Sequence, residues 1–190
     1  KIKPPSEKGR MDMKRRFGLS GKTIVLFTGC SHFPNIMAVE AIQYIASKTR
    51  SDNVMFVIAG SVGDQVRKQA MGNIRYTGYV NDIRPYFRLA DIAINPVLTV
   101  GGVNTKMIEY LANGLPTVTT SIGLKGLSLQ DGRHVIISNI DEFPEKIEEL
   151  TSNKEARHRL SEEGRRVVED CYDLRAIGRN ALAIYKSVLT

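Results

Sequence analysis

The sequence is poor in cysteine and has no long run of apolar residues. Its two cysteines, Cys30 and Cys171, have no metal-ligand spacing and are too few for a disulfide framework, which is typical of a reducing compartment. The longest apolar runs, such as Ile24–Phe27 and Val54–Ala59, are far shorter than the roughly 20 residues that cross a bilayer as a helix. These absences argue against a disulfide-stabilised domain and against a helical membrane protein.

Several motifs of catalysis and nucleotide binding are absent as well. No strand-like run is followed by G-x-G-x-x-G or by a P-loop, and no Ser-His-Asp spacing suggests acyl transfer. There is no Asp-x-Asp pair, so we predict no metal site. The chain also contains no repeat, no low-complexity tract and no interior linker.

The composition is that of one globular domain with an uneven charge distribution. The 190 residues are 42% hydrophobic and 25% charged, and the net charge is +7. Residues 1–22 contain eight basic and two acidic residues, a net of +6, so residues 23–190 carry only +1. The excess of basic over acidic residues therefore lies almost entirely in residues 1–22. A globular part so close to neutral argues against nucleic acid as the partner.

Short β-branched runs alternate with amphipathic segments along the chain. Strands are predicted at Thr23–Thr28, Val54–Ala59, Ile74–Thr77, Asp91–Asn95, Thr117–Thr120 and His134–Ser138. Helices are predicted at Ile36–Lys48, from after Gly63 to about Ala70, Asp82–Leu89 with Asn81 or Asp82 as the cap, Thr105–Asn113, Phe143–Thr151, Lys154–Cys171 and Asp173–Leu189. This alternation predicts a three-layer α/β domain with a doubly wound, Rossmann-like parallel sheet of about six strands.

The order of strands in such a sheet predicts where a ligand binds. With the common order 3-2-1-4-5-6, the order reverses between the first and fourth strands, and ligands bind beyond the carboxyl ends of the strands at that point. The loops that flank this point are 29–35 and 95–104, which contain several of the glycines. We therefore expect the functional site there.

The loop before the fifth helix has the features of a phosphate-binding site. Gly101 and Gly102 let the backbone approach a ligand closely, and the next N–H groups begin a helix. Lys106 adds a cation, and Glu109 follows three residues later on the same helix face. The alternative is a surface ion pair between Lys106 and Glu109, but the motif context favours a ligand site.

Histidines give weaker signals. His32 lies in the first loop, where hydrogen bonding to the backbone and a role in the site are equally good interpretations. His134 and His158 have no partners in the pattern and are predicted to be structural or exposed. Arg165 and Arg166 lie among acidic residues and indicate a solvated helix face.

Taken together, these motifs resemble the C-terminal, donor-binding domain of group 1 glycosyltransferases, which have the GT-B fold. The segments that carry the resemblance are Gly101–Thr120, Gly29, Pro34-Asn35, Ala38-Val39, Ala59-Gly60, Gly78–Asp82 and Ala90-Asp91. They occur in the family's order over nearly the whole chain, and 15–22 resembles the segment that enters this domain.

The resemblance implies a role for each matching residue. Glu109 matches the second acid of the family's Glu-x7-Glu motif, which binds the ribose hydroxyls. The backbone of Val103, Asn104 and Thr105 would hold the diphosphate. Lys106 would neutralise negative charge on this leaving group. Tyr79 and Val80 occupy positions that contact the nucleobase, and Gly29, His32, Gly101 and Gly102 complete the expected binding site.

Two departures from the family pattern leave alternatives open. The first acid of the Glu-x7-Glu motif is replaced by Gly101, and 30–32 replaces the usual Arg and Lys after the first strand. The alternatives are a non-catalytic nucleotide-binding domain and a GT-B nucleotide-sugar epimerase. A third, nucleic-acid binding through the basic segment, predicts steep salt dependence.

The expected activity is half of a retaining glycosyltransferase that moves a sugar from a nucleoside diphosphate to an acceptor. By the resemblance, residues 1–22 form a basic linker from the missing N-terminal acceptor domain, and residues 23–190 form the nucleotide-sugar-binding domain. No cofactor is expected besides the donor substrate, and this chain alone is expected to be inactive. We expect a cytoplasmic protein; the basic segment faces either the missing domain or an anionic inner-membrane surface carrying a lipid acceptor.

Overall fold

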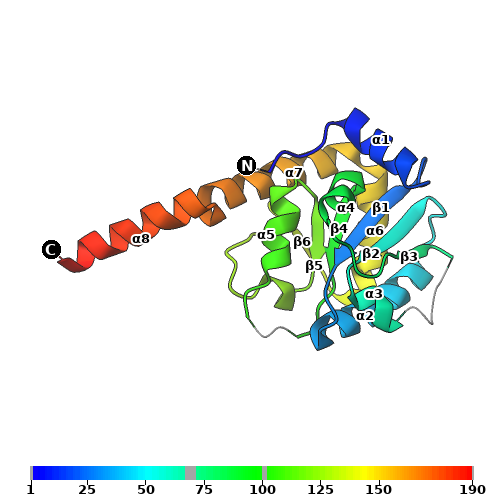
Figure 1. The fold of residues 1–190 in the computed structure, drawn as a ribbon, viewed down its shortest axis with the longest axis horizontal. Coiled ribbons are helices and arrows are strands. Elements are labelled where there is room, and N and C mark those ends of the chain that lie inside the picture. The colour runs from blue at the N-terminus through cyan, green and yellow to red at the C-terminus, as the bar shows by residue number, and fades with distance from the viewer. Residues whose placement is uncertain (1, 67–71, 100–101, 190) are drawn as a thin grey trace.

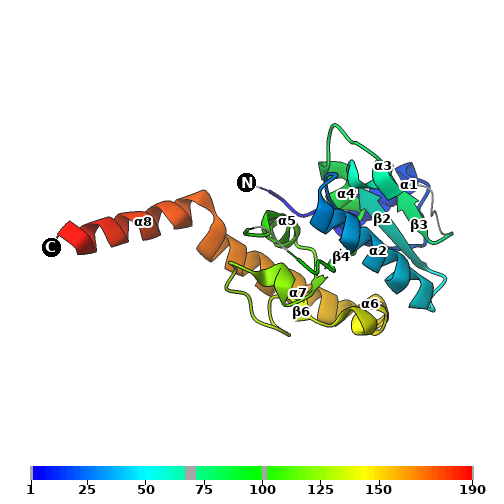
Figure 2. The ribbon, with the colours of Figure 1, turned by 90° about the horizontal axis from the view of Figure 1, so that it is seen from below.

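The protein forms a six-stranded parallel sheet between two layers of helices (Figures 1 and 2). The structure is a computed structural model that describes residues 2–66, 72–99 and 102–189. The strands are β1 (Thr23–Thr28), β2 (Val54–Ala59), β3 (Ile74–Tyr76), β4 (Ile92–Asn95), β5 (Thr117–Thr119) and β6 (Ile136–Ile137). They pair in the order β3-β2-β1-β4-β5-β6, which confirms the predicted Rossmann-like topology.

Helices connect the strands from β1 to β5 in succession, and helices cover both faces of the sheet. They are α1 (Glu7–Arg16), α2 (Phe33–Lys48), α3 (Val62–Val66), α4 (Arg84–Leu89), α5 (Thr105–Ala112), α6 (Phe143–Ser152), α7 (Lys154–Val167) and α8 (Leu174–Leu189). Helices α2, α3 and α6 pack on one face, and α4 and α5 pack on the other. Right-handed crossovers between parallel strands produce this two-sided cover.

The strand β1 shows how the sequence builds both cores. Val25 and Phe27 belong to the core beneath α2 and α6, whereas Ile24 and Leu26 belong to the core beneath α4 and α5. All four are fully buried. Because successive side chains of a strand point to opposite faces, a central strand covered on both faces is a continuous apolar run. This is why the apolar run within Thr23–Thr28 predicts a buried strand.

Several helices begin at different residues from those predicted, and α3 includes Val62 and Gly63, which were expected to precede it. Helix α2 begins at Phe33, three residues before the predicted Ile36, with His32 as its N-cap residue and Pro34 in its first turn. Proline is tolerated there because the first N–H groups of a helix have no partner within the helix. Helix α4 begins at Arg84, so the predicted cap at Asn81 or Asp82 is wrong in position, although Asp82 still accepts a hydrogen bond from the Arg84 N–H (3.0 Å).

Several predicted elements end early. The strand β6 has two residues instead of the five predicted at 134–138, and residues 67–70, predicted as the end of a helix, lie outside the described residues. The predicted helix Lys154–Cys171 ends at Val167, where the chain continues as a π-helical segment, Val168–Tyr172. These differences lie at the edge of the sheet and beyond it, so the centre of the domain is unaffected.

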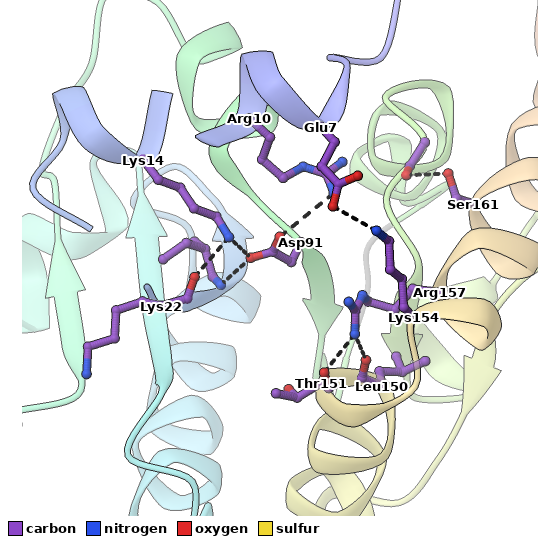
Figure 3. Close-up of polar contacts among 12 residues, drawn as sticks. Glu7, Arg10, Lys14, Lys22, Asp91, Leu150, Thr151, Lys154, Arg157 and Ser161 are labelled. Carbon is purple, nitrogen blue, oxygen red and sulfur yellow. Dashed lines mark hydrogen bonds and ion pairs between the residues drawn. The ribbon is translucent and has the colours of Figure 1, made fainter. Parts of the chain in front are cut away.

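The basic N-terminal segment contains a helix that the apolar pattern does not predict. The Ser6 hydroxyl caps α1 by accepting a hydrogen bond from the Gly9 N–H (3.2 Å), and basic residues occupy its last turn. The ammonium group of Lys14 binds the Asp91 carboxylate (2.5 Å), which also accepts from the Ile24 N–H (2.7 Å; Figure 3). Asp91 thus connects α1 to the beginning of β1.

The C-terminal helix α8 projects away from the rest of the domain (Figure 1). Five of its large apolar side chains are exposed: Leu174, Ile177, Leu182, Ile184 and Tyr185. Exposed apolar side chains gathered on one element often mark an interaction surface. Among the residues that the structure describes, no helix is long and apolar enough to cross a membrane.

Candidate functional site

A pocket of about 580 Å³ lies beyond the carboxyl ends of β1, β2 and β4, where the order of the strands reverses. Ten of the predicted site residues line it: Gly29, His32, Tyr79, Val80, Gly102, Val103, Asn104, Thr105, Lys106 and Glu109. The remaining one, Gly101, lies outside the described residues. The topology therefore brings together segments that are up to 80 residues apart in sequence (Gly29 to Glu109), at the place where doubly wound sheets bind ligands.

Tightly packed glycines form the floor of the pocket at the ends of β1 and β2. Gly60 has a φ of +112°, and a Cβ atom there would lie 2.2 Å from the carbonyl oxygen of Gly29. Any other residue would strain the backbone and push these two loops apart. The Gly60 N–H donates to the carbonyl of Gly78 (3.2 Å), which places the Tyr79 loop over the same pocket.

The helix α5 points its N-terminus into the pocket. Asn104 is its N-cap residue and makes no side-chain cap hydrogen bond. The first turn of an eight-residue helix carries partly positive N–H groups, which favour an anionic ligand. Asn104 and Thr105 both line the pocket, so the positive end of the helix and the ligand cavity coincide.

Lys106 is the one lysine or arginine among the described residues that line this pocket. Its Nζ donates to Oδ1 of Asn35 (2.7 Å) and lies 4.1 Å from the centre of the Phe27 ring. Burial lowers the pKa of Lys106 to about 7, although Cys30 and Glu109 act in the opposite direction. The surface ion pair considered above is therefore not what the structure shows, because the half-buried amine faces Asn35.

Glu109 lies one turn further along α5 and at the rim of the pocket. Partial burial raises the pKa of its carboxyl group, and the Lys106 cation lowers it. A carboxylate at the rim is available as a hydrogen-bond acceptor. The pocket therefore combines a cation and a helix N-terminus with an acceptor about one helical turn away.

The structure places His32 at the pocket, and its role there stays a prediction. Its backbone N–H donates to the Cys30 carbonyl (2.7 Å), and its exposed side chain lines the pocket. The other histidines do not line it. His134 is buried, and its Nδ1 accepts from the Gln130 N–H (3.1 Å), whereas exposed His158 lies 3.3 Å from Glu162. These two are structural and exposed, respectively, as predicted.

Two residues that the sequence patterns did not single out shape the site. The fully buried Tyr110 accepts a hydrogen bond from the Thr28 N–H (2.8 Å), which ties the end of β1 to α5. Burial also raises the pKa of Tyr110, so its hydroxyl stays protonated. The second is Asn35, the partner of Lys106. The signal for Asn35 was its place in the Pro34-Asn35 motif, to which no role was attached.

A second cavity, of about 410 Å³, lies beside α1 at the amino ends of β4 and β5, opposite the first pocket. Its cations have partners within the chain. Lys154 pairs with Glu7 (2.8 Å), and the Arg157 guanidinium donates to the carbonyls of Leu150 and Thr151 (Figure 3). This cluster holds helices together. Among the described residues, no group of three His, Cys, Asp or Glu side chains is placed to hold a metal ion.

The fold and the pocket define a doubly wound α/β domain of the Rossmann-like class, with a pocket at the reversal of strand order. The chain belongs to the group 1 glycosyl transferases: the model of that family matches residues 22–153. A curated relative, spore coat protein SA from Bacillus subtilis (strain 168), is 25% identical over 202 residues. That match covers 95% of this chain and 53% of the relative, so the chain spans about half of the relative's length.

Solved structures share the fold. One is the C-terminal domain of the group 1 glycosyl transferase LpcC from Francisella tularensis, with 16% identity and a TM-score of 0.72 over 90% of this chain and 96% of that one. Another is HepE from Anabaena in complex with UDP-glucose, with 11% identity and a TM-score of 0.80 over 97% of this chain and 54% of HepE. This chain is thus similar to a separately crystallised domain and to half of a larger protein.

Proposed function

We propose that this chain is the donor-binding half of a glycosyltransferase, which transfers a sugar from a nucleoside diphosphate to an acceptor with retention of configuration. The observation that supports this most strongly is the meeting of Lys106, the α5 N-terminus and Glu109 in one pocket at the strand-order reversal. The similarity to HepE, crystallised with UDP-glucose, agrees with this choice of ligand.

In the proposed complex, the diphosphate lies against the first turn of α5 and Lys106. Departure of the diphosphate leaves negative charge on its oxygens, and a fixed cation and helix dipole stabilise that charge as it develops. Glu109 accepts hydrogen bonds from the ribose hydroxyls at the rim, and Tyr79 and Val80 border the nucleobase. No metal or other cofactor is proposed.

The acceptor and its binding domain are proposed to belong to the other half of the enzyme. The exposed apolar side chains of α8, such as Leu174 and Tyr185, support a partner on that side of the domain. The proposed protein is cytoplasmic, and the exposed side chain of Arg16, in the last turn of α1, can face an anionic membrane surface. A lipid or glycan acceptor is consistent with that location.

Replacing Glu109 tests the ribose contact. We expect Glu109→Ala to weaken UDP binding by about 10- to 100-fold, because each hydrogen bond to a charged group contributes about 1.5–3 kcal/mol. Calorimetric titration with UDP, GDP and ADP measures this, and 2′,3′-dideoxy-UDP isolates the ribose. The variant should no longer distinguish UDP from the dideoxy analogue. Glu40→Ala, an exposed acid on α2 outside the pocket, is the matched control. Unchanged discrimination in Glu109→Ala would refute the ribose assignment.

The half-enzyme assignment makes a separate prediction. This chain should bind a nucleotide sugar and yet release no nucleoside diphosphate from it when glycan or lipid acceptors are added. Addition of the complete enzyme's other half should restore release. Turnover by this chain alone would contradict the assignment, and binding without turnover in the reconstituted enzyme would favour the non-catalytic domain, to which the missing first acid points.

A further inference from the structure

The side chain of Asn35 is held in one orientation by groups on both sides of its amide. Its Nδ2 donates to the carbonyl of Cys30 (3.0 Å), and its Oδ1 accepts from Nζ of Lys106 (2.7 Å). The first bond requires the nitrogen on the Cys30 side, so the oxygen faces Lys106. Asn35 comes from the first turn of α2, whereas Lys106 comes from α5, 71 positions later.

The end of β1 provides the space that this side chain occupies. A Cβ atom on Gly29 would lie 3.0 Å from Cγ and 3.1 Å from Nδ2 of Asn35. Such contacts are tighter than most, so any other residue at this position would displace the Asn35 amide by a few tenths of an ångström. Gly29, the Cys30 carbonyl and the beginning of α2 therefore form a seat for Asn35.

The position of the Lys106 amine would otherwise be poorly determined. A lysine side chain has four rotatable bonds, so its amine can occupy many positions. Here one hydrogen bond and one ring contact restrict the Lys106 side chain strongly. The titratable groups that share the pocket wall with it are Cys30, His32, Tyr79 and Glu109. Asn35 provides the hydrogen-bond acceptor that the structure places on its Nζ.

We propose that Asn35 is a positioning residue, which holds the Lys106 amine at the pocket wall so that the cation is in place before the diphosphate arrives. The inference rests on the proposed function for the identity of the ligand. A neutral acceptor suits this role, because it orients an ammonium group without cancelling its charge. An aspartate at the same place would still accept from the amine, but it would neutralise the charge and could not donate to the Cys30 carbonyl.

Two substitutions at Asn35 should change the pKa of Lys106 in opposite directions. Asn35→Asp places a carboxylate beside the amine, which raises its pKa well above the value of about 7 in the parent protein. Asn35→Leu removes the acceptor and leaves an apolar neighbour, which lowers the pKa further. Carbon-labelled lysine followed by NMR reports this value directly, and the signal of Lys106 is assigned from its absence in Lys106→Arg. All variants carry Cys30→Ser, so that the thiol does not titrate in the same range.

The pH dependence of UDP binding is the second readout. Between pH 7 and 9, the affinity of the parent should fall by more than tenfold, as a neutral Lys106 must take up a proton to pair with the diphosphate. Asn35→Asp should bind about tenfold more weakly at pH 7, yet its affinity should stay nearly constant over this range. Asn35→Leu should be about tenfold weaker throughout. Asn73→Asp, the same change at a half-buried asparagine that donates to the Ala46 carbonyl, is the matched control and should keep the parental profile.

The outcomes separate this inference from the proposed function. A purely structural role for Asn35 would lower affinity in both variants without moving the pKa of Lys106 in opposite directions, and that result would overturn the inference. If the parent bound no nucleoside diphosphate, the proposed function would fail, and the NMR titration alone would decide whether Asn35 holds Lys106. Opposite pKa shifts together with the flattened profile of Asn35→Asp would support both.

Discussion

Replacing Lys106 with methionine should stabilise the ligand-free domain while removing most of its affinity for a nucleoside diphosphate. We expect UDP binding to weaken by about 100-fold, since charge-assisted hydrogen bonds to phosphate contribute about 1.5–3 kcal/mol. Methionine keeps the length of the side chain and its packing against the Phe27 ring, 4.1 Å from Nζ in the parent. The variant therefore removes the charge with little change in shape.

The gain in stability follows from the lowered pKa of Lys106. Its usual pKa is 10.5, whereas the folded protein lowers it to about 7, so folding at neutral pH works against protonation of the amine. Partial exposure of the side chain and solvent screening limit the expected gain to about 1–2 kcal/mol. Chemical denaturation at pH 7 measures this gain. Lys125→Met, at an exposed lysine outside the pocket, should change stability by less than about 0.5 kcal/mol.

The same pKa gives the gain a definite pH dependence. Between pH 7 and 10.5 the unfolded chain binds more protons at Lys106 than the folded chain does, so this residue makes the parent more stable as the pH rises. The methionine variant lacks this pH-dependent contribution to stability, because methionine does not titrate. The stability difference between variant and parent should therefore shrink from pH 7 towards pH 10, and a difference that grows instead would contradict the burial of this amine.

Replacing Asp91 with alanine should destabilise the domain by about 3 kcal/mol. The carboxylate is 13% exposed and binds Lys14, which is 14% exposed. Its loss leaves the Ile24 N–H without this acceptor, and it leaves the Lys14 ammonium group with the Lys22 carbonyl but no counter-charge from Asp91. Removing one partner of a buried ion pair costs about 3–5 kcal/mol. For a chain of this size, the melting temperature should fall by roughly 6–12 °C.

The control for Asp91 lies on the helix that it anchors. Asp12 of α1 pairs with Arg15 at 2.6 Å, and both side chains are at least half exposed. Asp12→Ala should therefore change stability by less than about 1 kcal/mol. Hydrogen exchange in α1 should accelerate in Asp91→Ala and remain slow in Asp12→Ala. Equal effects of the two substitutions would show that the Lys14–Asp91 contact does not hold α1 on the domain.

The sheet could be predicted because its signals are local. Runs such as Thr23–Thr28 and Val54–Ala59 are apolar over their whole length, which is what burial on both faces requires. The order of strands followed from the handedness of the crossovers and from the commonest topology of such domains. The edge strand β6 was overestimated because only Ile136 and Ile137 of the predicted range pair with β5.

The helix α1 could not be predicted from the spacing of apolar residues. None of its residues is buried, so it has no apolar stripe to detect. Its capping signals were nevertheless present, with Ser6 before the first turn, basic residues in the last turn and Gly18 with a φ of +66° just after it. The Lys14–Asp91 contact that fixes the helix joins residues 77 positions apart, and no local pattern carries that information.

The residues of the candidate site could be predicted better than their interactions. The family motif and the strand order located Lys106 and Glu109 in one pocket. The hydrogen bond between Asn35 and Lys106 could not be predicted, because it depends on how α2 and α5 are placed by β1 and β4. The proline in the first turn of α2 also made Asn35 look like a loop residue, although it lies on the helix.

The most direct test of the central claim is to map UDP onto the domain by amide chemical shifts. Binding at the strand-order reversal predicts the largest changes at 29–32 and 102–106, with Lys106→Met abolishing them at the same UDP concentration. Residues around the second cavity, such as Arg10 and Arg157, should be unaffected. Changes confined to the second cavity, or no saturable change at all, would contradict the assignment of the first pocket as the donor site.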